Sequence, residues 1–421
     1  MKKVLALVLS LAMALSMCVA LTGCGEEKNP QGNTVLSIDE VEKTVAAKME
    51  AVAKEDFKIG LICLHDENST YDNNFIQAMK KAQTDLGLTD EQVLIKVNIN
   101  EDEACYTAAS ELVEAGCDII FADSFGHETY MIQAAKEFPD VQFCHATGTR
   151  AQTELLGNYH NAFASIYEGR YLAGVAAGLK LNEMIEAGKI TAEQAKIGYV
   201  AAWNYAEVIS GFTSFYLGAK SVCPSATMKV TYTNSWFDIA LEREAALNLI
   251  NSDCVLISQH ADSEGAPKAC EEKKVPNVAY NISTISMAPT TALISSKIDW
   301  TPYFKMIINT ALEGGTIPVD YCGTIEDGMV ALTELNETVA AESTQEKLNA
   351  VKQDLVDGKV KVFDTDSFTV DGKALTTYLA DVVTDDAFTP DTEAVIDGEF
   401  SESTKRSAPY FNIMYIDGIS E

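Results

Sequence analysis

Short apolar runs alternate with amphipathic segments along the chain from residue 57 onward. The run FKIGLICL is followed by a segment with apolar residues at helical spacing, on the stripe Phe75, Ala78, Met79, Ala82 and Leu86. Runs of the same kind predict strands at 57–64, 92–99, 118–123, 141–148, 196–202, 228–234, 254–258, 276–282 and 292–299. Nearly all-apolar strands that alternate with helices indicate parallel sheets covered by helices on both faces.

The strands and helices form two series in tandem, which predicts an α/β fold with two doubly wound parallel-sheet lobes and a cleft between them. We expect lobe one to comprise residues 57–162 and about 290–320. Lobe two is expected to comprise residues 163–289 and about 321–421, including a C-terminal extension.

Three segments refine this expectation. The run at 292–299 and the helix after it are expected to return the chain to lobe one. Alternation at 358–363 predicts an edge strand, and the apolar stretch 408–419 is expected to pack against the body.

The strand ends supply candidate ligand contacts, because ligands of doubly wound sheets bind beyond the carboxyl ends of the strands. With two lobes, both sets of ends can face one cleft. These ends are rich in polar and aromatic residues: Leu64-His65-Asp66, Ala122-Asp123-Ser124, Ala146-Thr147-Gly148, Ala202-Trp203-Asn204, Asn234-Ser235-Trp236, Ser258-Gln259-His260 and Tyr280-Asn281.

The junction TNSWFD at 233–238 holds one of only three Trp in the chain. Adjacent residues of a strand face opposite sides, so of Trp236 and Phe237 one can lie in the core and the other in the cleft. We expect Trp236 to form the cleft wall and Phe237 to pack behind it. Asp238 either caps the following helix or touches the ligand.

The N-terminus has the pattern of a secretory signal at residues 1–23, with an apolar run at 4–20 after a charged start. The sequence LTGC at 21–24 is typical of a lipobox, whose Cys carries lipid. We therefore expect a lipid anchor on Cys24 and a location on the extracytoplasmic face of the cell membrane. Residues 24–56 are expected to form a tether and one surface helix. An uncleaved signal anchor is the alternative.

Charge and motifs exclude several function classes. The chain has 62 acidic and 31 basic residues, and so acidic a body repels nucleic acid. It contains no GxSxG, Walker loop or HExxH, and its five His have no metal-ligand spacing. We expect no enzyme activity, no catalytic residue, no metal and no cofactor. Outside the signal and the anchor, eight Cys remain without a CxxC, and one disulfide stays possible.

Several segments together carry a family resemblance: FADSFGHETYMIQAAKEFPDVQFCHATG, GRYLAGVAAG, IGYVAAWNYAEVISGFTSFYLGAKSV, NSWFDIALEREAA and SQHADS. In order and spacing they resemble the basic membrane protein family. The resemblance runs from about residue 57 to 335. It implies a lipoprotein with a type I periplasmic-binding-protein fold, which binds substrate for an ABC importer. The NSWFD and QHADS branch resembles receptors for purine bases or nucleosides.

The resemblance also implies a ligand site. A purine would lie between Phe75 of lobe one and Trp236 of lobe two, with polar contacts from Asp123 and Asn281. Further candidate contacts at the cleft rim are Asp66, Ser124, Asp262, Trp203, Glu207 and Asp238. The implied partners are a purine nucleoside or base, and the permease and ATPase subunits of an ABC importer.

Two departures from the family pattern keep alternatives open. Ile76 stands where the family has Asn, and Ile298 where nucleoside receptors have a ligand-contacting Lys. A free base therefore stays possible. So does a ligand-sensing lipoprotein for another flat heterocycle, such as riboflavin, that is not coupled to transport. A secreted nucleoside-processing enzyme is a further rival.

Overall fold

The computed structural model describes residue 45, residues 48–382 and residues 392–421. The expected signal and Cys24 lie outside these residues, as does most of the expected tether, and residues 48–56 form no helix. Within the described ranges, no helix is both long and apolar enough to cross a membrane. The described residues belong to one compact unit.

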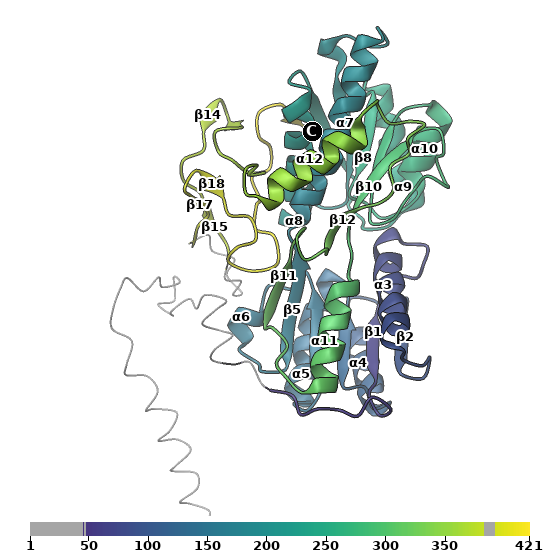
Figure 1. Ribbon diagram of the computed structural model, residues 1–421, viewed down its shortest axis with the longest axis vertical. Helices are drawn as coiled ribbons and strands as arrows, with labels where there is room; N and C mark the ends of the chain where they lie inside the picture. Colours follow the sequence, from purple (N-terminus) through teal and green to yellow (C-terminus); the bar gives the residue numbers. More distant parts are fainter. Residues whose placement is uncertain (1–44, 46–47, 383–391) are drawn as a thin grey trace, which may run out of the picture. The chain divides into compact units, whose positions relative to one another are not determined.

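Lobe one is built on a six-stranded sheet in the order β11-β5-β4-β3-β1-β2, in which all neighbours are parallel (Figure 1). Four of its strands, β1 to β4, form within runs that the apolar pattern predicts. Its strands are β1 (Ile59–Ile62), β2 (Val93–Lys96), β3 (Ile119–Ala122), β4 (Gln142–Ala146), β5 (Tyr159–Ala164) and β11 (Asp320–Gly323).

Helices cover both faces of this sheet. Side chains of β3 alternate between two hydrophobic clusters, with Phe121 packing toward α3 and α11 and Ile120 toward α4 and α5. Strand residues buried on both sides account for the absence of polar positions in these runs. The helices of lobe one are α3 (Thr70–Leu86), α4 (Glu103–Glu114), η1 (Phe125–His127), α5 (Glu128–Glu137), α6 (Ala151–Glu154) and α11 (Thr301–Glu313).

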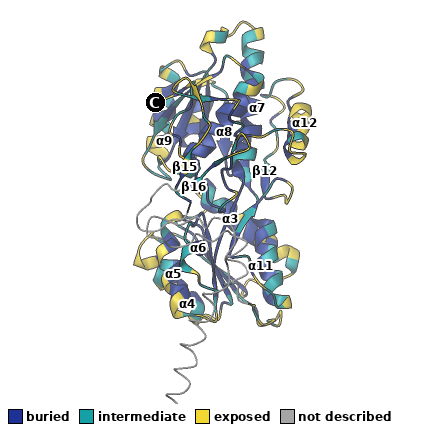
Figure 2. Ribbon diagram, turned by 90° about the vertical axis from the view of Figure 1, so that its left-hand side faces the viewer, coloured by how far each residue is buried: buried dark blue, intermediate teal, exposed yellow. Residues whose placement is uncertain are grey.

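Lobe two is built on a seven-stranded sheet in the order β12-β10-β9-β8-β6-β7-β19. All neighbours are parallel except β12, which runs antiparallel to β10. The strands are β6 (Lys196–Ala201), β7 (Thr227–Tyr232), β8 (Leu256–Gln259), β9 (Asn277–Tyr280), β10 (Ala292–Ile298), β12 (Val330–Leu332) and β19 (Ile419–Ser420). The helices are α7 (Ile166–Glu186), η2 (Ala192–Gln194), α8 (Ala206–Val222), α9 (Ile239–Asn251) and α10 (Gly265–Lys273). The strands of both sheets are buried beneath partly exposed helices (Figure 2).

The chain crosses between the lobes at points that differ from the expected boundaries. Strand β10 stays in the sheet of lobe two, and only the helix after it, α11, packs on lobe one. Strand β11 then completes the sheet of lobe one beside β5. Strand β5 was not predicted, because His160 and Asn161 interrupt its apolar pattern. The His160 ring is buried and bonds to Gln142 and to the Pro318 carbonyl.

The C-terminal extension touches both lobes. Helix α12 (Thr344–Val356) packs on α7, and the last strand, β19, pairs with β7 of lobe two. The Gln152 amide of lobe one donates to the Lys405 carbonyl at 2.6 Å, and the Ser407 N–H donates to Asp320 at 2.9 Å. The short strands between are β13 (Thr369–Val370), β14 (Lys373–Ala374), β15 (Leu379–Ala380), β16 (Thr392–Glu393), β17 (Val395–Ile396) and β18 (Glu399–Phe400).

The edge strand expected at 358–363 is absent, since those residues form a turn and irregular backbone. Its apolar positions, Val362 and Phe363, are nevertheless buried, and the Phe363 ring stacks on Phe411 with centroids 4.5 Å apart. These apolar residues are therefore buried by side-chain packing, without pairing to another strand. The stretch 408–419 packs against the body, as its composition predicts.

Helices α7 and α8 approach each other through a seam of glycines. A methyl group at Gly174 would lie 2.0 Å from the Phe215 carbonyl oxygen, and one at Gly218 would lie 2.0 Å from the Tyr171 carbonyl oxygen. Both obstacles are backbone atoms of the partner helix. These glycines therefore set the distance between the two helices.

Candidate ligand-binding site

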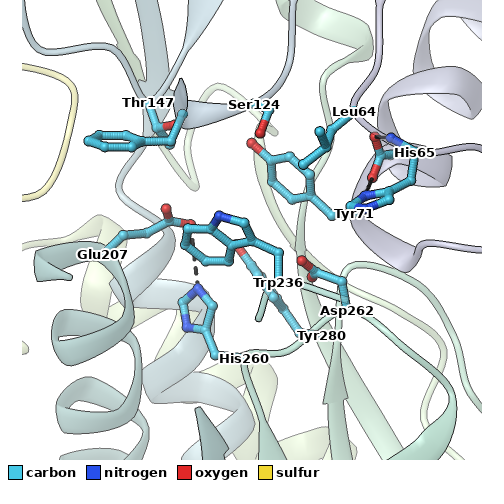
Figure 3. A pocket seen from close by; sticks show the side chains of 12 residues that line it. Leu64, His65, Tyr71, Ser124, Thr147, Glu207, Trp236, His260, Asp262 and Tyr280 are labelled. Carbon is cyan, nitrogen blue, oxygen red and sulfur yellow. Dashed lines mark hydrogen bonds and ion pairs between the residues drawn. The ribbon is translucent and has the colours of Figure 1, made fainter. Parts of the chain in front are cut away.

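A cavity with an empty volume of about 390 Å³ lies between the carboxyl ends of the two sheets (Figure 3). We call it the inner cavity. It is lined by Leu64, His65, Tyr71, Asp72, Ser124, Phe125 and Thr147 of lobe one and by Glu207, Trp236, His260, Asp262 and Tyr280 of lobe two.

The lobes are joined by hydrogen bonds at the edge of the inner cavity. The Thr70 N–H of α3 donates to the Asp262 carbonyl of lobe two at 2.8 Å. Beside it, the Asn281 amide donates to the Asp262 carboxylate at 2.9 Å. The Asn74 amide donates to the Ile298 carbonyl at 2.6 Å. The N-terminal end of α3 is thus one part of lobe one that meets lobe two.

Trp236 lines the inner cavity from the loop between β7 and α9, as expected for a strand end. Its carbonyl accepts from the Asp262 N–H at 2.9 Å, so two neighbouring loops of lobe two are bonded together. Glu242, fully buried behind them, accepts from the N–H groups of Asp238 and Ser263 at 3.1 Å and 3.0 Å. Burial raises the pKa of Glu242 to about 7.

The alternative roles of Asp238 are distinguished by its bonds. Its carboxylate accepts from the N–H groups of Ala240 and Leu241, so it caps α9 and does not line the inner cavity. The expectation for Phe237 was wrong. Its ring does not pack behind Trp236 and instead lies 5.4 Å from the His65 ring of lobe one. Phe237 therefore contributes to the contact between the lobes.

The structure also corrects the position of Phe75. Its ring is fully buried in the core of lobe one and stacks on Trp300 with centroids 4.5 Å apart. Tyr71, one helical turn earlier on the same stripe, lines the inner cavity instead. Its hydroxyl donates to the Asp123 carbonyl at 2.7 Å. The aromatic that faces the cleft from α3 is therefore Tyr71.

Asp123 supports the site from behind and is not among the lining residues. Its carboxylate accepts from the Leu64 N–H at 3.2 Å. Burial and the nearby Asp72 raise the pKa of Asp123 well above its usual range. Against the effect of burial, hydrogen bonds from His65 and Ser69 hold the pKa of Asp72 below its usual value.

One group of side chains in the described ranges comes close enough to hold a metal ion, namely Cys63, Asp72 and Asp123. Their ligand atoms lie within 4.8 Å of one another, and all three are buried. Asp72 already accepts bonds from the His65 N–H and the Ser69 hydroxyl. We therefore interpret these three side chains as a structural support for the loop that follows β1.

Two carboxylates face the inner cavity from lobe two. Burial raises the pKa of Asp262 well above its usual range, and the neighbouring Glu242 adds to the shift. Glu207 lies 3.4 Å from Nε2 of His260. Burial, with Arg170 nearby, lowers the pKa of His260 to about 4. This ring is therefore neutral near pH 7.

The remaining predicted residues divide between the inner cavity and its surroundings. Ser124 lines the inner cavity and donates to Glu101 at 2.6 Å. Asn281 lies behind Asp262 with a left-handed backbone (φ 70°), which Asn adopts more readily than most residues. Asp66 and Trp203 are not among the lining residues. Asp66 accepts from Asn68 within its own turn, and the Trp203 ring stacks on Tyr205.

The inner cavity continues into a wider space, which we call the outer groove, with an empty volume of about 2000 Å³. The two share the lining residues Phe125, Thr147, Glu207 and Trp236. The C-terminal extension contributes to the far wall of the outer groove, mainly through residues 406–412. The extension therefore belongs to the surroundings of the site.

The choice of candidate residues missed most of the lining. Position at a strand end was a sufficient signal for five of the missed residues, namely Leu64, His65, Thr147, His260 and Tyr280. Three further lining residues lie within or before helices and had no such signal, namely Tyr71, Asp72 and Phe125.

Comparisons with known proteins agree on the class of protein. The sequence profile of the Bmp family, described as ABC transporter substrate-binding protein PnrA-like, matches residues 59–365. A purine-binding protein of Brucella abortus is 30% identical over 322 residues, which cover 75% of this chain and 87% of that protein. TsgA13 of Haloferax volcanii, provisionally named an ABC transporter glucose-binding protein, is 33% identical over 258 residues. That match covers 61% of this chain and 62% of TsgA13.

Among solved structures, an ABC transporter solute-binding protein from Conexibacter woesei has a TM-score of 0.59 at 20% identity. The match covers 72% of this chain and 98% of that one, and it shows the same type I fold. Family and fold are those of solute-binding proteins and not of enzymes.

Proposed function

The chain belongs to the Bmp family of ABC transporter substrate-binding proteins, and from this premise we propose that its ligand is a purine nucleoside or a purine base. Proteins of this class bind a small ligand and deliver it to a permease driven by an ATPase. The observation that carries the proposal is that Tyr71 and Trp236, from opposite lobes, line one cavity. Flat aromatic ligands stack on such rings. The purine-binding relative from Brucella abortus supports the same ligand class.

Titration calorimetry of the purified protein tests this proposal with adenine, adenosine, glucose and riboflavin at one salt concentration. We expect adenine or adenosine to bind and glucose to give no heat. Glucose is included because TsgA13 carries a glucose-binding name. Binding of glucose alone would contradict the stacking argument, and binding of riboflavin alone would favour the other flat heterocycle.

Trp236→Ala is expected to weaken purine binding by about 1–3 kcal/mol, the typical contribution of stacking one base on an aromatic ring. Trp236 is half-buried, so the variant should remain folded. Trp203→Ala is the matched control, because that ring stacks on Tyr205 and does not line the inner cavity. If Trp236→Ala instead loses stability and keeps its affinity, Trp236 acts as a core residue.

We also propose that lipid on Cys24 holds the protein at the extracytoplasmic face of the cell membrane. The support is the sequence LTGC after an apolar run that begins behind two lysines. Cys24→Ala should move the protein from the membrane fraction of its host to the soluble fraction. An unchanged distribution between the fractions would argue for a signal anchor.

A further inference from the structure

The lining of the inner cavity has one chemical bias, an excess of hydrogen-bond acceptors. Three of the hydroxyl groups that line it already donate hydrogen bonds to protein acceptors. Tyr71 donates to the Asp123 carbonyl, Ser124 to the Glu101 carboxylate and Thr147 to the Ala146 carbonyl, at 2.7, 2.6 and 2.7 Å. What Ser124 and Thr147 can still offer a ligand is oxygen lone pairs.

The two carboxylates of lobe two add to this bias. One oxygen of Asp262 accepts from Asn281, and one oxygen of Glu207 lies near His260. The second oxygen of each accepts no hydrogen bond from the described part of the chain. Glu207 and Asp262 lie on either side of Trp236 in Figure 3, so a ring stacked there would have an acceptor near each edge.

Donors are fewer. Of the lining groups, the indole N–H of Trp236 and the hydroxyl of Tyr280 have no protein acceptor in the described ranges. The Tyr280 hydroxyl is itself buried. A ligand that matches this lining therefore presents mostly N–H groups along its edges.

Lys and Arg side chains are also missing from the lining within the described ranges. The nearest guanidinium, that of Arg170, is buried beneath the Tyr280 ring, 3.4 Å from its centroid, and donates to the Gln259 carbonyl. In the outer groove, Arg150 pairs with Glu154, and Arg406 donates to backbone carbonyls. A phosphate group is bound best by such cations, and none of the described Lys or Arg residues contacts the inner cavity.

We propose that the inner cavity selects purines that present an amino group to Asp262 or Glu207 and excludes ligands that carry an anionic group. This inference rests on the proposed function, since it names which purines the site accepts. The physical reason is that an acceptor facing another acceptor leaves both buried and unpaired, which costs more than the bond itself contributes.

Calorimetry with adenosine, guanosine, inosine and adenosine 5′-monophosphate tests the inference on the unaltered protein. Adenosine has an amino donor at ring position 6 and an acceptor nitrogen at position 1, where inosine has a carbonyl acceptor and an N–H donor. Guanosine adds an amino group to the ring of inosine. We expect adenosine or guanosine to bind about tenfold or more tightly than inosine, and the monophosphate to bind at least about tenfold less tightly than adenosine.

The outcomes distinguish a failure of this inference from a failure of the proposed function. Inosine binding as tightly as both amino nucleosides would overturn the inference and leave purine binding intact; this would occur if a protonated Asp262 donates to the ring carbonyl. Monophosphate binding equal to adenosine binding would also overturn it. If none of the four ligands binds, the proposed function itself fails.

Two variants identify the carboxylate that accepts a hydrogen bond from the amino group. Asp262→Asn and Glu207→Gln keep the shape of each side chain, but each places an N–H donor beside the remaining acceptor. We expect one of them to reduce the ratio of amino to oxo nucleoside affinity to within about threefold. Asp66→Asn, outside the cavity lining, is the matched control and should keep the ratio. An unchanged ratio in both cavity variants would overturn the assignment.

Discussion

Phe75→Ala is expected to lower the free energy of unfolding by about 3–5 kcal/mol, the range for removing a buried aromatic side chain. The Phe75 ring is fully buried between Trp300, Phe121 and Tyr71, with centroids 4.5, 5.6 and 4.9 Å away. Removing it leaves a cavity that these rigid rings cannot close. Chemical denaturation of the unliganded protein measures the change.

Phe125→Ala is the matched control for this prediction. It removes the same side chain from a position that is 42% exposed, so the loss of stability should stay below about 1 kcal/mol. If Phe75→Ala kept full stability and lost purine binding, Phe75 would be the stacking residue that the family resemblance implies.

Gly174→Ala should destabilise the protein by about 3 kcal/mol or more, at the upper end for overpacking. The new methyl group would lie 2.0 Å from the Phe215 carbonyl oxygen of α8. A backbone atom cannot rotate away as a side chain can, so α7 and α8 must separate. Loss of the tight α7–α8 contact then exposes apolar surface along both helices.

Gly169→Ala provides a control within the same helix. There the methyl group would meet a side-chain methyl of Val330 at 2.9 Å, which can move. The gain in helix propensity, about 1 kcal/mol, is the same in both variants. We expect Gly169→Ala to lie within about 1 kcal/mol of the parent protein. Equal thermal and chemical stability of the two variants would show that the seam tolerates a wider spacing.

The sequence predicted the doubly wound sheets well because a buried parallel strand is almost wholly apolar. The prediction failed at β5, where His160 and Asn161 interrupt the apolar pattern. The His160 ring bonds to the Pro318 carbonyl, which lies far away in the chain. Only the folded chain brings these partners together.

The candidate site shows a similar limit. The strand-end rule named Trp236, His260 and Tyr280 because the ends of parallel strands meet at one edge. It could not choose between Tyr71 and Phe75, which lie on one helical stripe four residues apart. Which of them reaches the cleft depends on how far α3 extends beyond the sheet, and its N-terminal residue Thr70 bonds to lobe two. Spacing within the helix does not contain that information.

The order of the strands has a consequence for biosynthesis. Lobe one receives β11 only after the strands β6 to β10 of lobe two have been synthesised, and the sheet of lobe two receives β19 only after β11. Contacts of such long sequence separation form slowly. Each lobe can therefore complete its sheet only after strands of the other lobe have been synthesised.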